Sequence, residues 1–327
     1  MPAWGRKSTL LALVLALMPI CQARAQNFPG SKMSIVVPVV PGGGTDLLGR
    51  VIAERLEKKW HNSIVVENKP GAGTIIGAQT VAKAPPDGNT MLIATSTTLA
   101  INPAIYKALP YDPLADFKLV AIVASVPFIL VVNPSLPVHS VQELIAYAKG
   151  KPGELAFGSS GSGTPHHLFA ELFQSMTGTK MTHVPYRGSM PALTDLLSGQ
   201  IQVHFVDFPP ALPQIQAGKI RALGVTPAKR VALVPDVPTI AEAGVSGYDA
   251  SAWQALVVPG KTPDDVVAKI SEAMHEILAE VEVKNRISSA GMVPLDGSTP
   301  DKLKSFLKSE LETWAAVVNR VGLAGSQ

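Results

Sequence analysis

Short apolar runs that alternate with amphipathic stretches limit the fold of this chain more than any other feature of its sequence. Apolar runs at 33–40, 63–68 and 90–95 are typical of buried strands. Residues 45–60 carry apolar side chains at helical spacing, and 71–84 predict a Gly-rich turn followed by a second helix. This order predicts a parallel sheet covered by helices, an architecture of the α/β class.

The same alternation returns in the second part of the chain. We expect strands at 154–160, 181–186, 201–207 and 220–226, and helices at 140–149, 165–176, 189–198 and 209–217. Three more helices are predicted near 263–279, 281–290 and 300–320. The second alternation therefore predicts a second sheet with its own helices.

The longest apolar run beyond the N-terminus, 118–134, lies between these two parts. Pro127 interrupts it, so we interpret the run as two consecutive buried strands rather than a membrane helix. A proline there suits a crossing between domains, and 327 residues are long for a single core. We expect domain 1 to comprise 26–127 plus 248–327, and domain 2 to comprise 128–247.

The N-terminal stretch is typical of a cleavable signal peptide. Arg6 and Lys7 form a positive segment, and the apolar run 10–20 is too short to span a bilayer as a helix. Small residues at Ala23 and Ala25 fit a cleavage site. We expect residues 1–25 to be removed and the mature chain to be periplasmic.

Cleavage changes the chemistry that is available to the mature chain. The only cysteine, Cys21, leaves with the signal, so no thiol remains for a disulfide, a metal or a nucleophile. Three of the 28 Lys and Arg residues leave as well, so 25 remain against 25 Asp and Glu. This balance gives no indication of nucleic acid or an anionic membrane as partner. A lipid anchor at Cys21 is the alternative, and Ile20 before it fits poorly.

The segment VPVVPGGGTDLLGR, residues 37–50, joins the first predicted strand to the first helix. Thr45 or Asp46 is the expected N-cap of that helix. Open α/β sheets bind ligands at the carboxyl ends of strands, and helix N-termini offer unpaired N–H groups to anions. Three glycines leave this backbone bare, which suits a small anion that contacts N–H groups directly. A tight turn that needs glycine is the alternative.

A second loop of this kind is FGSSGSGTPHHL, residues 157–168. It follows a predicted strand and precedes a helix, with Thr164 as expected N-cap and Pro165 in the first helical position. Three hydroxyls are added by Ser159, Ser160 and Ser162. We expect the two loops, one in each domain, to face each other across a cleft.

Several enzyme and cofactor classes lack their motifs. The first loop has neither G-x-G-x-x-G nor G-K-[ST], which argues against nucleotide binding. Residues 158–163, GSSGSG, do not supply the G-x-S-x-G nucleophile motif. His166 and His167 are adjacent on a predicted helix and suit a shared metal poorly. We expect no cofactor and no metal.

A hydrolase that uses a Ser/His pair in the same cleft stays as the alternative to a binding protein. The side chains available to it are His166, His167, His183 and His204, with Asp195 or Asp207 as the orienting carboxylate. No spacing among them selects a triad. We therefore expect a protein that is not an enzyme.

Two charged residues flank the predicted helix 189–198. Arg187 follows an apolar strand and precedes Gly188, where it can pair with a ligand carboxylate through both nitrogens or form a structural ion pair. Asp207 ends the next strand, where it can accept from a ligand or hold a loop. The sequence leaves both choices open.

Seven segments in fixed order resemble one known family across essentially the whole mature chain. They are IVVPVVPGGGTDLLGR, VENKPGAG, LAINPAIYKALPYDP, FGSSGSGTPHHLFAELF, VPYRGSMPALTDLLSGQ, AGKIRALGVT and PDVPTIAEAGVSGY. The chain resembles the Bug receptors, the periplasmic solute-binding proteins of tripartite tricarboxylate transport systems. The resemblance implies a monomeric clam-shell of the type II periplasmic-binding-protein fold, a carboxylate ligand such as a di- or tricarboxylate, an aromatic carboxylate or an acidic amino acid, and integral-membrane transporter subunits as partners.

The resemblance also implies which residues contact the ligand. In the first domain they are Val40, Pro41, Gly42, Gly43, Gly44, Asp46, Ser96 and Thr97. In the second domain they are Ser159, Ser160, Gly161, Gly163, Thr164, Tyr186, Arg187, Gly188 and Asp207. The chain departs from the family pattern at Val40, often proline, and at Thr74 and Ile75, often Gly-Asn. The less polar loop around Thr74 and Ile75 suggests a more apolar ligand, such as an aromatic or longer-chain carboxylate.

Overall fold

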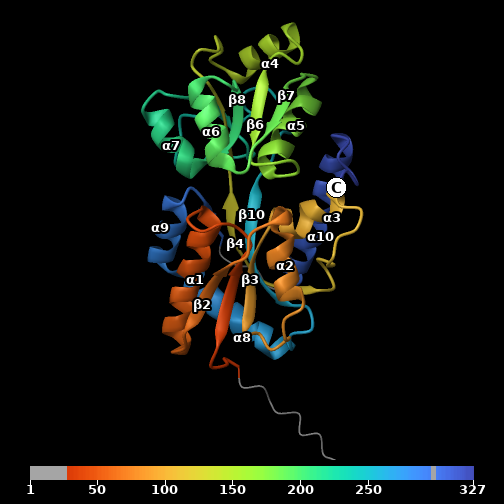
Figure 1. Ribbon diagram of the computed structural model, residues 1–327. Helices are drawn as coiled ribbons and strands as arrows, with labels where there is room; N and C mark the ends of the chain where they lie inside the picture. The colour runs from red at the N-terminus through yellow and green to blue at the C-terminus, as the bar shows by residue number, and fades with distance from the viewer. Residues whose placement is uncertain (1–27, 296–299) are drawn as a thin grey trace, which may run out of the picture.

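The computed structural model describes residues 28–295 and 300–327, so the predicted signal peptide lies outside the described residues. The chain forms two α/β domains, each with its own sheet, as Figure 1 shows. This confirms the expected fold class. No helix within 28–295 or 300–327 combines the length and apolar character needed to cross a bilayer.

The first sheet has the strand order β11-β4-β10-β3-β1-β2. Its strands are β1 (Met33–Val37), β2 (Ile64–Asn68), β3 (Thr90–Thr95), β4 (Phe117–Val126), β10 (Ala252–Pro259) and β11 (Val293–Pro294). The predicted parallel pairing is confirmed for β1 with β2 and β3. The expectation of a parallel sheet is wrong for the remainder, because β10 pairs antiparallel with β3 and β4, and β11 pairs antiparallel with β4.

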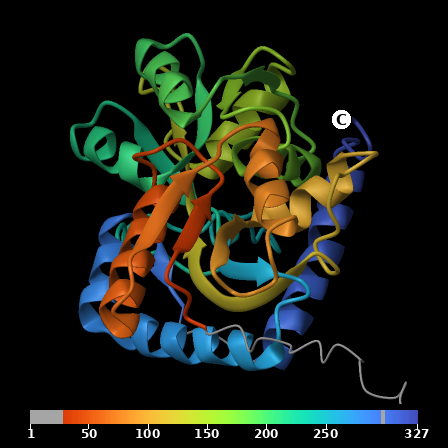
Figure 2. The same ribbon diagram turned by 60° about the horizontal axis from the view of Figure 1, so that its bottom comes forward.

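Helices cover both faces of the first sheet. One face carries α1 (Gly44–Trp60), α8 (Asp264–Ala279) and α9 (Val281–Ser289), and the other carries α2 (Ile75–Ala82), α3 (Asn102–Ile105) and α10 (Pro300–Arg320). Ile35 and Val37 of β1 pack with α1, whereas Val36 packs in the opposite cluster, as strand alternation requires. Figure 2 shows α1 and α2 on the two sides of β1.

The second sheet has the order β7-β6-β8-β5-β9. Its strands are β5 (Phe128–Val132), β6 (Ala156–Ser159), β7 (Thr182–Pro185), β8 (Val203–Asp207) and β9 (Arg221–Val225). The helices around it are α4 (Val141–Gly150), α5 (Pro165–Thr177), α6 (Ser189–Ser198) and α7 (Phe208–Gln216). All nine elements were expected from the sequence, with ends that differ by a few residues.

The strand directions place the carboxyl ends of several strands from both sheets on the same side of the domain connection. β4 is antiparallel to β10, which is antiparallel to β3, so β4 runs in the same direction as β3 and β1. Only Pro127 separates the end of β4 from the start of β5. Phe128 of β5 pairs with Asp207 at the end of β8, and β6 is parallel to β8. The carboxyl ends of β1, β3, β6 and β8 therefore all lie on the side of the Pro127 connection.

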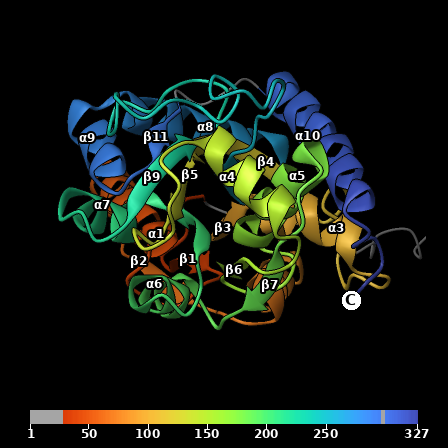
Figure 3. The same cartoon turned by 90° about the horizontal axis from the view of Figure 1, so that it is seen from above.

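The last helix, α10, links the two domains in addition to the connection at Pro127. Trp314 of α10 stacks on Phe169 of α5, with ring centroids 5.9 Å apart and planes 19° apart. α10 also contacts α3 and the π-helix η2 (Thr97–Ile101) of the first domain. Figure 3 shows it running along the side of the molecule past α3 and α5. One hydrophobic cluster consequently contains residues from both sheets.

Replacing Gly77 with alanine tests how tightly α2 holds the segment that leads to the triple glycine. A Cβ at Gly77 would lie 2.7 Å from Pro38 Cβ and 3.2 Å from the Lys69 carbonyl oxygen. We expect Gly77→Ala to lower the free energy of unfolding by about 1–3 kcal/mol through overpacking. Chemical denaturation measures it. Thr80→Ala on the exposed side of α2 is the control and should change it by less than about 0.5 kcal/mol; equal effects would contradict the interpretation.

Candidate ligand-binding site

The first helix begins one residue earlier than the sequence suggested. Gly43 is its N-cap, with extended φ and ψ of −86° and 174° and no side-chain hydrogen bond. The expectation that Thr45 or Asp46 caps the helix is wrong. Asp46 lies in the first turn and accepts instead from the Gly42 N–H at 3.0 Å. The backbone N–H groups at the start of α1 are therefore left without a capping side chain.

The Asp46 carboxylate holds the loop in shape. It is only 4% exposed and accepts from Arg50 Nε at 3.0 Å and Asn68 Nδ2 at 2.9 Å. Asn68 Nδ2 also donates to the Val39 carbonyl at 3.1 Å. Burial opposes ionisation of Asp46, but the hydrogen bonds from Arg50, Gly42 and Asn68 outweigh it and hold the carboxyl's pKa below 3.8. Asp46 is thus a structural anion that positions the loop.

The three glycines are not equivalent. Gly42 has a φ of +93°, which favours glycine and explains this residue as part of a turn. Gly43 has an ordinary φ, and a Cβ there would meet nothing within 4 Å. At Gly44 a Cβ would make only an ordinary contact with Met292, at 3.7 Å. The turn therefore explains why residue 42 is glycine but gives no reason for glycine at residue 43. Val40 and Pro41, which precede the glycines, are exposed.

A buried polar floor lies at the carboxyl end of β3. Gln254 of β10, paired in register with Thr95, donates from Nε2 to Thr45 Oγ1 at 2.9 Å. Within 28–295 and 300–327, neither its Oε1 nor the Ser96 hydroxyl has a hydrogen-bond partner, and both atoms are buried. Thr97 is half-buried at the start of η2. The sequence predicted Ser96 and Thr97 but missed Gln254, because its strand comes from a distant part of the chain.

In the second loop, the Ser159 hydroxyl is fully buried and supports the backbone. It accepts from the Gly161 N–H at 3.1 Å and lies 2.6 Å from His183 Nε2. Burial, with a smaller contribution from neighbouring His167, lowers the pKa of His183 to about 4. His183 is therefore neutral at pH 7, and the Ser159 side chain shapes the loop from below.

Thr164 and Gly163 complete this loop. Thr164 occupies the predicted N-cap position of α5, yet its hydroxyl donates back to the Gly161 carbonyl at 2.7 Å instead of capping the helix. The Gly163 N–H donates to His167 Nδ1 at 3.1 Å. A Cβ on Gly163 would lie 2.7 Å from Ile105 Cδ1 of α3, so the second-domain loop abuts the first domain here.

Four side chains meet at this loop. Ser160 and His166 come from the loop and the start of α5, Asp207 from the end of β8, and Ser189 from the start of α6. Ser160 Oγ lies 2.8 Å from His166 Nδ1, and His166 Nε2 lies 3.3 Å from Asp207 Oδ1. Ser189 at the start of α6 donates to the same Asp207 oxygen at 2.8 Å. Burial opposes ionisation of Asp207, but the hydrogen bonds from His166 and Ser189 hold its pKa below 3.8. Asp207 thus holds neighbouring segments, the second of the two roles left open.

The remaining predicted residues lie between β7 and α6. The Tyr186 hydroxyl donates to Asp195 Oδ2 at 2.7 Å, and burial together with that carboxylate raises its pKa to about 12. Gly188 is the N-cap of α6 with a φ of +126°. Arg187 is exposed and forms no ion pair with another described residue. Its guanidinium is therefore available to an anion.

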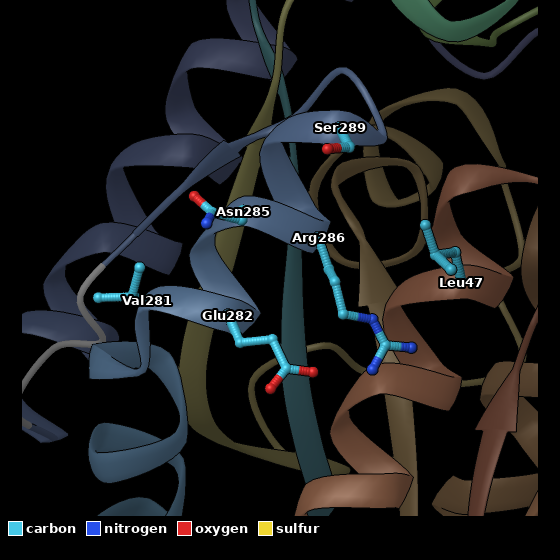
Figure 4. A pocket seen from close by; sticks show the side chains of 6 residues that line it. All are labelled: Leu47, Val281, Glu282, Asn285, Arg286 and Ser289. Atoms are coloured by element: carbon cyan, nitrogen blue, oxygen red, sulfur yellow. The ribbon is translucent and has the colours of Figure 1, made fainter.

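Two hollows lie elsewhere on the molecule. One of about 610 Å³ lies between α1 and α9, and Figure 4 shows its lining, which comes from Leu47, Val281, Glu282, Asn285, Arg286 and Ser289. The other, of about 400 Å³, lies beside the domain connection and is lined by residues that include Ser125, Leu172, Trp253, Glu310 and Trp314. Neither contains a residue predicted to bind the ligand.

The family model described as "Tripartite tricarboxylate transporter family receptor" matches residues 48–323. The chain belongs to this receptor family. Its members are receptors for solutes, which agrees with the sequence-based expectation of a binding protein. The second-domain loop lies inside the matched segment, whereas the first loop, residues 40–46, lies just before it.

Relatives agree with this assignment over nearly the whole chain. Protein BugT of Bordetella pertussis is 36% identical over 299 residues, which cover 91% of each chain. The structure "R. palustris Rpa4515 with adipate" has 38% identity and a TM-score of 0.83, covering 91% of this chain and 99% of that one. MatC from Rhodopseudomonas palustris "with bound malate" has 31% identity and a TM-score of 0.79, covering 89% and 100%. These similarities confirm the resemblance to Bug receptors and the two-domain fold.

Asp46→Asn tests whether this carboxylate holds the first loop of the receptor. Because the folded pKa is lowered, the contribution of Asp46 is complete above pH 3.8 and is lost as the pH falls through the folded value. We expect Asp46→Asn to lower the free energy of unfolding by about 1–3 kcal/mol at neutral pH. Urea denaturation across the pH range measures it. A difference that persists unchanged in acid would contradict an ionic role.

Proposed function

We propose that this receptor captures a small dicarboxylate in the periplasm and delivers it to an integral-membrane transporter. The observation that carries the proposal is Gly43, whose backbone angles and surroundings do not require glycine. A bare backbone at an uncapped helix start suits direct contact between N–H groups and a carboxylate. The adipate and malate named for two related structures support a ligand of this class.

The donors around the site are sufficient for useful affinity. A hydrogen bond to a charged group contributes about 1.5–3 kcal/mol, and a helix N-terminus adds about 0.3–1 kcal/mol. Micromolar binding needs about 8 kcal/mol after ordering costs. Backbone N–H donors at the start of α1 together with the Arg187 guanidinium reach that range. We assign the ligand contacts to the residues expected from the sequence, except Asp46, Ser159 and Asp207, whose side chains hold the loops. Gln254 is added as part of the floor.

Within this class we propose a longer, more apolar dicarboxylate such as adipate. In the Gly-rich turn before α2, the Thr74 hydroxyl accepts a hydrogen bond from the Thr98 hydroxyl at 2.9 Å. Ile75 is buried, and Ile76 is 47% exposed. Among its side chains, this loop therefore offers the exposed apolar surface of Ile76 and a single hydroxyl hydrogen, that of Thr74, to the middle or far end of a ligand. A ligand with methylene groups between its carboxylates matches that surface better than a hydroxylated one.

We further propose that the monomer binds by closure of its two domains about the connections near Pro127 and residue 247. Domain 1 then comprises 26–127 plus 248–327, and domain 2 comprises 128–247. Closure would bring the two loops together around the ligand, since both follow strand ends that lie beside Pro127. The closed form is the one that a transporter would recognise.

A hydrolase is the second candidate because His166 contacts Ser160 through one ring nitrogen and Asp207 through the other. It predicts turnover of an activated ester such as p-nitrophenyl acetate that Ser160→Ala abolishes. We expect no turnover beyond the buffer rate, since the family consists of receptors. Spectrophotometry of released p-nitrophenol decides the point, and Ser160-dependent turnover would support the hydrolase instead.

Gly43→Val separates a ligand role from a turn role. The side chain would occupy open space, so we expect the unfolding free energy of the ligand-free protein to change by about 1 kcal/mol or less. Dicarboxylate affinity should fall at least about tenfold, because the side chain blocks approach to the N–H groups. Calorimetric titration of residues 26–327 with adipate, malate, succinate and citrate measures this.

Gly150→Val is the matched control for this titration, because a Cβ there also meets nothing within 4 Å and Gly150 lies at the end of α4. It should leave the affinity unchanged. Unchanged affinity in Gly43→Val would contradict the assigned site, and failure of all four acids to bind the wild type would contradict the proposed ligand class.

A further inference from the structure

The Ser160–His166–Asp207 contact has a consequence for how protons move when the ligand binds. Asp207 is ionised, because its hydrogen bonds hold its pKa below the ordinary value. An ionised carboxylate only accepts hydrogen bonds, so His166 Nε2, 3.3 Å away, carries a hydrogen that points to Asp207. The state of the other ring nitrogen, Nδ1, then decides what the Ser160 hydroxyl can do.

Ser160 has one hydrogen and His166 Nδ1 lies 2.8 Å from its oxygen. When His166 is neutral, Nδ1 has no hydrogen and must accept, so the hydrogen of Ser160 is directed to the ring. Ser160 then presents only lone pairs to the cleft. A ligand carboxylate also presents only lone pairs, so this arrangement would repel the ligand rather than hold it.

A proton on Nδ1 reverses the contact. The imidazolium donates from Nδ1 to Ser160 Oγ, and the Ser160 hydrogen turns to the ligand carboxylate. The new positive charge lies between the ligand and Asp207, so it offsets the repulsion between two carboxylates. One proton from solvent adds to Nδ1, and no other covalent bond forms or breaks.

We propose that His166 is a positioning residue that takes up a proton when a carboxylate binds, and that this proton turns the Ser160 hydroxyl into a donor to the ligand. The inference rests on the proposed function, because it requires a carboxylate ligand at Ser160. It goes beyond that function by coupling solute capture to pH: affinity rises as the pH falls.

The other groups around His166 do not replace it as the proton acceptor. His204 of β8 stacks on it at 5.5 Å between ring centroids, and burial and then the neighbouring His166 lower the pKa of His204 to about 3. Phe128 of β5 packs edge-on at 4.8 Å and carries no charge. Ser189 of α6 donates its hydrogen bond to Asp207 and not to His166. Asp207 is the charged partner that stabilises the imidazolium.

Calorimetric titration in two buffers of different ionisation enthalpy counts the protons taken up. The probe is adipate, or whichever acid of the panel above binds most tightly, at about pH 7–8, where simple carboxylic acids are fully ionised. We expect the wild type to take up about 0.5–1 proton per ligand, with affinity rising up to about tenfold per unit fall in pH. Ser160→Ala should bind more weakly and take up almost none.

Histidine variants locate the proton. We expect His166→Gln to bind without uptake, while His275→Gln, on the exposed side of α8, keeps the full wild-type value. His183→Gln alters the support of Ser159 and is expected to weaken binding but to retain uptake. Uptake that is lost in His183→Gln and kept in His166→Gln would overturn the assignment.

Nitrogen-15 NMR of the imidazole rings tests the ligand-free wild type independently of any variant. We expect His166 to carry a hydrogen on Nε2 alone at about pH 8 and on both nitrogens when adipate is bound. A His166 that is already doubly protonated in the free protein would overturn the proposal. Binding without proton uptake would also overturn it while leaving the proposed function intact, and absence of any binding would remove both.

Discussion

The connection at Pro127 is the constraint on which the arrangement of the molecule depends. Because β4 passes into β5 through a single residue, the direction of one sheet fixes the direction of the other. Strands β1 and β3 run with β4, and β6 and β8 run against β5, so all four end on the same side. The polar loops that follow those strand ends therefore lie on the Pro127 side of their respective sheets.

One carboxylate in each domain, buried Asp46 and partly exposed Asp207, then holds the adjoining loop through hydrogen bonds. In the first domain Asp46 organises the triple-glycine segment through backbone and side-chain donors. In the second domain Asp207 organises the Ser/Gly loop through His166 and the start of α6 through Ser189. Both carboxylates are used to fix protein groups, so the ligand is left to the backbone N–H groups and to hydroxyls that surround them. This division suits an anionic solute, because a free carboxylate facing the cleft would repel it.

Gly43 is a glycine for which the folded structure supplies no conformational or packing reason. Its neighbour Gly42 is explained by a left-handed backbone, and Gly77 by close contact with Pro38, whereas Gly43 has space and ordinary angles. The same reasoning applies to polar groups. Gln254 Oε1 and Ser96 Oγ, at the end of β3, are buried and have no hydrogen-bond partner in the described part of the chain. Burial of such atoms is unfavourable unless a ligand or water completes their hydrogen bonds. Residues without a folding reason are the better candidates for contact with the solute.

The sequence by itself determined the two rounds of strand and helix, the position of the crossing, and the two polar loops at helix starts. These follow from local periodicity and from glycine, proline and serine at fixed places, which short stretches contain in full. Only the tertiary structure decided that β10 enters the first sheet antiparallel, bringing Gln254 to Thr45, and that Ser160, His166 and Asp207 meet. The Gln254–Thr45 and His166–Asp207 contacts join residues from separate segments. Spacing along a chain carries no information about which distant strands pair. The tertiary structure also decided the N-cap of α1. Gly43 is the cap, and Asp46 lies in the first turn, where it accepts from the Gly42 N–H.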